Sequence, residues 1–109
     1  MLAIQSIDGR DCPVIVCDIC GGKLDNASKA AAVFQNFVPD GAELKVLHVH
    51  KGSIDGRTCR AQADALLGKD GAAVGWQEMA THLADLAHNA GFPATEMAKH
   101  EEGRLRFDV

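Results

Sequence analysis

Cys17 and Cys20 form a C-x-x-C motif that Gly21 and Gly22 follow directly. The preceding residues 13–16 (Pro-Val-Ile-Val) are mostly β-branched, which indicates a strand running into the motif. Two thiolates can face one ion only where the chain turns tightly, and glycine takes positive φ and lets backbone amides approach sulfur. A strand, C-x-x-C and glycine in this order are typical of a zinc knuckle.

Thiol redox proteins use the same motif, but there the first cysteine begins a helix that lowers its pKa. The Gly-Gly pair breaks a helix, and no β-α-β pattern surrounds the motif. Residues 1–10 contain no basic segment with a long apolar run, so we expect no signal peptide and a cytoplasmic location. Clustered cysteines in that reducing compartment more often bind metal than form structural disulfides. Redox chemistry at Cys17 and Cys20 is kept as an alternative.

A structural zinc ion takes four protein ligands, so two more must come from elsewhere in the chain. Residues 43–50 predict a strand that ends in an H-x-H motif, and Cys59 follows after eight intervening residues. His48 and His50 share one face of that strand because side chains alternate. His50 lies at the strand end, from which a side chain reaches a metal site more readily. The predicted zinc ligands are Cys17, Cys20, His50 and Cys59, with His48 as the alternative ligand.

The remaining cysteine and histidines are predicted to lie outside the site. Cys12 falls outside the knuckle spacing, and an isolated cysteine is most often a small buried hydrophobe. His82, His88 and His100 are predicted to be solvated residues of a helix face or of the tail.

The first half of the chain predicts a small antiparallel sheet with the knuckle at one end. Residues 2–7 end at Asp8-Gly9, a strong hairpin-turn signal, so we expect them to pair with residues 12–17. Residues 30–38 are predicted to form a second hairpin with the strand that ends in H-x-H, through a turn at Pro39-Asp40-Gly41.

The second half predicts one short and one longer helix. Asp55 or Thr58 can cap a short helix through Leu67 that Gly68 ends. The longer, amphipathic helix is predicted from apolar residues that recur at steps of three and four; these are Trp76, Met79, Leu83, Leu86 and Ala90. Trp76 is expected to be a buried anchor at the start of this helix.

The chain has 109 residues, which corresponds to a single domain of the α+β class. The β-rich part (1–52) and the helical part (53–92) are each too small to fold alone. The polar tail (93–109) carries alternating Leu105 and Phe107. We therefore expect it to be frayed or to form an edge strand, which would also offer a route to a homodimer.

The Cys17–Gly21 motif, the hairpin that carries His48 and His50, and Cys59 together resemble a small bacterial variant of the zinc-ribbon (zinc β-ribbon) proteins over roughly residues 12–60. The second half-site departs from the ribbon pattern, which usually has another C-x-x-C or C-x-x-H. The resemblance implies a structural metal and a module that interacts with protein or nucleic acid, and it implies no particular partner.

Charge and motif content bear on the kind of function. The net charge of −4 argues against tight nonspecific nucleic-acid binding, and no run of about 18 apolar residues predicts a membrane span. Basic residues near the predicted site could contact phosphates or form a solvated face; they are Lys45, Lys51, Arg57 and Arg60.

A zinc enzyme, the other alternative, needs three protein ligands, a water and a nearby acid or base. Asp18 and Asp55 are the only carboxylates close in sequence to the ligands, and no H-E-x-x-H motif is present. We therefore predict no catalytic residues and a non-enzymatic, zinc-stabilised interaction module.

Overall fold

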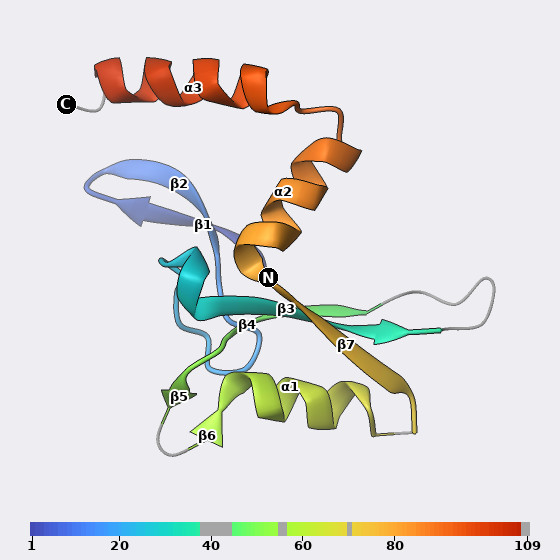
Figure 1. Cartoon of the computed structure of the whole chain (residues 1–109). Coiled ribbons are helices and arrows are strands. Elements are labelled where there is room, and N and C mark those ends of the chain that lie inside the picture. Colours follow the sequence, from blue (N-terminus) through green and yellow to red (C-terminus); the bar gives the residue numbers. More distant parts are fainter. Residues whose placement is uncertain (38–44, 55–56, 70, 108–109) are drawn as a thin grey trace.

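The computed structural model describes residues 1–37, 45–54, 57–69 and 71–107. Its fold is mixed α+β, as predicted, with antiparallel sheets and helices (Figure 1). The elements in chain order are β1 (Leu2–Ile7), β2 (Arg10–Ile15), the 3-10 helix η1 (Ala27–Lys29), β3 (Ala30–Asn36), β4 (Val46–His50), β5 (Ser53–Ile54), β6 (Arg57–Thr58), α1 (Cys59–Leu67), β7 (Ala73–Glu78), α2 (Met79–Asn89) and α3 (Ala94–Phe107).

The first hairpin, β1 and β2, pairs antiparallel as predicted, with Ile7 opposite Arg10. Asp8 and Gly9 both have positive φ (51° and 78°), the backbone that a two-residue hairpin turn requires. A bridge between Val16 and Lys23 continues this region into the C-x-x-C loop.

A three-stranded antiparallel sheet in the order β4-β3-β7 forms the centre of the molecule. The predicted pairing of β3 with β4 is confirmed, while the turn predicted at residues 39–41 lies outside the described residues. Residues 30–33 at the start of β3 are at most 1% exposed, because helices pack on both faces of this strand. Figure 1 shows α1 and α2 on opposite sides of the sheet.

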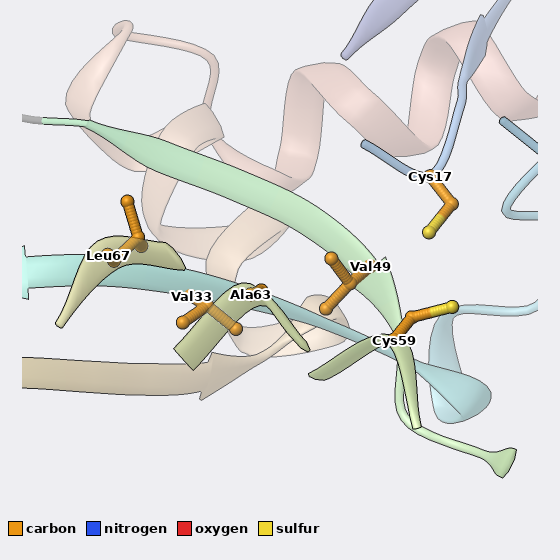
Figure 2. Packing of buried hydrophobic residues seen from close by; sticks show 6 residues of the cluster. All are labelled: Cys17, Val33, Val49, Cys59, Ala63 and Leu67. Carbon is orange, nitrogen blue, oxygen red and sulfur yellow. The ribbon is translucent and has the colours of Figure 1, made fainter. Parts of the chain in front are cut away.

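The core between the sheet and α1 is small and ends at the C-x-x-C loop. Thr58 caps α1 by accepting a hydrogen bond from the Ala61 backbone N–H at 3.0 Å, and Gly68 is the C-cap, as predicted. Figure 2 shows Leu67 at one end of the cluster and two cysteines at the other. The cluster consists of Cys17, Val33, Val49, Cys59, Ala63 and Leu67.

The predicted position of Trp76 at a helix start is wrong. Trp76 lies on β7 opposite Val33, and α2 begins only at Met79. Its side chain is 42% exposed, with the Arg60 guanidinium 3.9 Å from its ring centroid, so it is not a buried anchor. β7 joins the sheet of the first half, so residues 53–92 are not purely helical.

The expectation of an edge strand or a frayed segment in the tail is also wrong, because residues 94–107 form α3. Phe92 and His100 make an edge-to-face ring contact with centroids 5.4 Å apart. In the parts of the chain that the structure describes, no helix combines the length and apolarity needed to cross a membrane.

Candidate metal centre

The C-x-x-C loop is closed by its own backbone. The Cys17 N–H donates to the Gly22 carbonyl at 2.8 Å, and the Gly21 N–H donates to the Cys17 carbonyl at 3.0 Å. Gly21 has a φ of 76°, which a side chain rarely tolerates. The Gly22 N–H points at the Cys20 sulfur at 3.4 Å. The two glycines thus make the tight turn and supply an amide to a sulfur, as the knuckle interpretation requires.

Asp18, inside this loop, fastens it to the outer edge of β4. The Asp18 N–H donates to the His48 carbonyl at 2.9 Å, and its carboxylate accepts from the His48 N–H at 2.8 Å. The two bonds set the position of the loop along the strand. They bring Cys20 beside His50, two residues further along β4.

Four side chains from three segments meet at this point: Cys17, Cys20, His50 and Cys59. Their ligand atoms all lie within 4.8 Å of one another, and the Cys20 sulfur lies 3.4 Å from His50 Nδ1. In a tetrahedral zinc site with ordinary bond lengths, a sulfur and a nitrogen ligand lie about 3.6 Å apart. The spacing and the three-sulfur, one-nitrogen donor set therefore fit a zinc ion, and the cluster could hold a metal.

The cluster opens to solvent on one side. Cys17 and Cys59 are buried in the core, His50 is half-buried and Cys20 is exposed. Figure 2 shows Cys17 and Cys59 approaching from separate segments at one end of the core. A bound ion would therefore tie the core to the surface loop.

The electrostatics of the two buried thiols differ. Burial raises the pKa of Cys17, but hydrogen bonds from the backbone of Cys20, His50 and Ile19 outweigh it and lower this pKa to about 6. Burial, reinforced by the neighbouring Cys17 and Cys20, raises the pKa of Cys59 to about 12. Cys17 is thus the more acidic of the two buried thiols.

His48, the alternative ligand, is not part of this group. Its Nε2 lies 3.3 Å from Nε2 of His82 on α2. Burial, followed by the charge of the chain's amino group and by His82, lowers the pKa of His48 against the opposing effect of Asp18. His82 was predicted to be a solvated helix residue, and this is wrong. Spacing within one helix gives no signal for a partner on a strand 34 positions earlier.

The predicted basic cluster is largely engaged elsewhere. Lys51 forms an ion pair with Glu78, and Arg60 stacks on Trp76. The side chain of Arg57 lies outside the described residues.

Of the two carboxylates considered as an acid or base, Asp18 is bound to the backbone of β4, and Asp55 falls outside the described residues. Comparison of the chain with protein-family models, curated proteins and solved structures gives no match.

Proposed function

We propose that this chain is a zinc-binding domain in which Cys17, Cys20, His50 and Cys59 hold one structural Zn²⁺. The observation that carries the proposal is the convergence of these four ligand atoms within 4.8 Å. Four protein ligands fill a tetrahedral shell and leave no position for a catalytic water. This argues for a structural ion over the alternative of a zinc enzyme.

The small core explains why such an ion would matter. The largest fully buried side chains among the described residues are Met79, Val33, Val49 and Cys59. A core this small contributes little free energy, and small domains often add a metal or a partner. Zinc binding would supply folding free energy directly, because the site forms only when the loop, β4 and α1 come together.

The same geometry bears on the redox alternative. The second cysteine of the motif lies 3.4 Å from His50, and Cys59 also belongs to the group. Cys17 leads into a glycine turn and does not begin a helix. A thiol oxidoreductase needs neither a histidine nor a third cysteine at this place, whereas a zinc site uses both.

We propose further that the domain is an interaction module with a protein partner in preference to nucleic acid. The net charge is negative, and Lys51 and Arg60 are engaged within the chain. Phosphate contacts by free basic residues dominate nucleic-acid affinity. Titration with labelled single- and double-stranded DNA and RNA should show no binding at physiological salt, and a salt-resistant complex would reverse this choice.

Cobalt substitution tests the metal site. The Co²⁺ form should show thiolate-to-metal charge transfer and the intense visible bands of a tetrahedral ion. Cys20→Ser and His50→Ala should each reduce or shift these bands. Cys12→Ser is the matched control, because Cys12 lies outside the group, and it should leave them unchanged. A spectrum that lacks thiolate charge transfer in the unmodified chain would contradict the proposal.

A further inference from the structure

A second pair of metal-binding side chains lies on the α2 face of the sheet, outside the cysteine group. His48 on β4 and His82 on α2 bring their Nε2 atoms to 3.3 Å, and their ring planes are inclined by 56°. His48 is 15% exposed and His82 is half-buried, so the pair lies in a partly sheltered place that solvent still reaches.

The His82 ring is held by a short chain of polar groups. Asp85 accepts a hydrogen bond from Gln77 Nε2 at 2.6 Å, which turns the Gln77 carbonyl oxygen toward His82. That oxygen lies 3.3 Å from His82 Nδ1. A hydrogen on Nδ1 satisfies this contact and leaves the lone pair of Nε2 directed at His48.

The His48 ring differs on its Nδ1 side. Its Nδ1 lies 3.8 Å from the Asp18 carboxylate and 3.3 Å from the Met1 amino group, while its Nε2 faces His82. Metal-ligating histidines usually present one nitrogen to the ion and the other to a carboxylate or carbonyl oxygen. His82 meets this pattern through the Gln77 carbonyl oxygen. The nearest group to His48 Nδ1 is the Met1 amino group, and the Asp18 carboxylate lies beyond hydrogen-bond distance.

From this geometry we propose that His48 and His82 form a second, two-histidine site for a divalent transition-metal ion such as Zn²⁺ or Ni²⁺. Two nitrogens bound to one tetrahedral zinc ion lie about 3.3 Å apart, given ordinary zinc–nitrogen bonds. This equals the observed spacing of the two Nε2 atoms.

In the second site the ion takes the place of the hydrogen between the two Nε2 atoms. That hydrogen moves to Nδ1 of His48, where it faces the Met1 amino group, and the amino group releases one proton to solvent. Two protein ligands leave the remaining positions to water or to a small ligand. The site therefore binds an exchangeable ion, unlike the closed cysteine centre.

The test is the zinc stoichiometry of the protein that already carries its first, tightly held ion. Equilibrium dialysis against Zn²⁺ should give a second, weaker equivalent in the unmodified chain. His82→Ala should lose this second equivalent and keep the first. His88→Ala, an exposed histidine on the same helix, is the matched control and should keep both. Gln77→Ala should lower the affinity for the second zinc ion by about tenfold to a hundredfold.

A second measurement does not depend on any variant. Ring resonances of His48 and His82 in the zinc-loaded chain should shift with the second equivalent, and those of His88 should not. The proposal is overturned if the unmodified chain binds only one zinc ion, or if the second ion still binds after His82→Ala. In either case His48 and His82 only form a hydrogen bond with each other. Loss of the first, cysteine-bound equivalent would instead contradict the proposed function, so the two failures are distinguishable.

Discussion

Replacing Asp18 tests how the C-x-x-C loop is held against the sheet. The carboxylate accepts the His48 N–H at 2.8 Å and is 20% exposed, so solvent only partly replaces it when it is removed. A hydrogen bond to a charged group contributes about 1.5–3 kcal/mol. Asp18→Ala should therefore lower the free energy of unfolding of the zinc-loaded protein by about 1.5–3 kcal/mol.

The same substitution should weaken zinc binding. Because folding of the site and zinc binding are coupled, a less stable folded form lowers the apparent zinc affinity by the same free energy. At 1.4 kcal/mol for each factor of ten, the expected loss is about tenfold to a hundredfold. Urea denaturation gives the stability, and competition with a chromophoric chelator gives the affinity.

Two further variants sharpen this test. Asp18→Asn keeps an acceptor oxygen without the charge and should lose only about 1 kcal/mol. Asp25→Ala removes an exposed carboxylate after the loop and should change stability by less than about 0.5 kcal/mol. If Asp18→Ala matches the unmodified chain in both stability and zinc affinity, the Asp18 contacts do not position the loop and the reasoning is refuted.

Three other outcomes follow from the structure. Trp76→Ala should lower the free energy of unfolding by about 1–2 kcal/mol in urea denaturation, because the ring is 42% exposed and stacks on Arg60. Truncation of a buried aromatic costs about 3–5 kcal/mol, so a loss of that size would place the ring in the core. Gly75→Ala should lower the free energy of unfolding by about 1–3 kcal/mol, because the added Cβ would lie 2.5 Å from the side-chain nitrogen of Asn36 on β3. Unchanged stability in urea denaturation would contradict this packing. Zinc affinity should rise at least tenfold per pH unit from pH 7 to 9, because Cys59, whose pKa is raised to about 12, must release its proton to bind the ion. A flat profile by calorimetry would refute this assignment.

The predicted hairpins depended on local signals that tertiary packing does not override. Asp8-Gly9 selects one turn geometry, and alternation on either side fixes the pairing of β1 with β2. The choice of His50 over His48 rested on its place at a strand end. The structure puts His50 beside Cys20 and turns His48 toward α2.

The missed strand β7 shows where two periodicities compete. Val74 and Trp76 alternate as in a strand, but Trp76 also fits the helical series that Met79 and Leu83 continue. In the sheet, Gly75 makes room for side chains on β3. Only the pairing with β3 decides between the two, and that contact is not local.

The tail was predicted from its few apolar residues, and its helical signals were overlooked. Pro93 directly precedes α3, Glu96 lies in its first turn, and Glu96 pairs with Lys99 one turn on. These features favour a helix start. The link between His48 and His82 could not be predicted, because it depends on how α2 packs against the sheet.

The most direct test of the central claim is the metal content of protein purified without added metal, combined with thiol modification. The account predicts one zinc per chain, with Cys17, Cys20 and Cys59 protected from alkylation until a chelator is added. Removal of the ion should then lower the melting temperature and the circular dichroism together. Protein without metal, whose cysteines react equally with and without chelator and whose melting temperature does not change, would contradict the structural-zinc account.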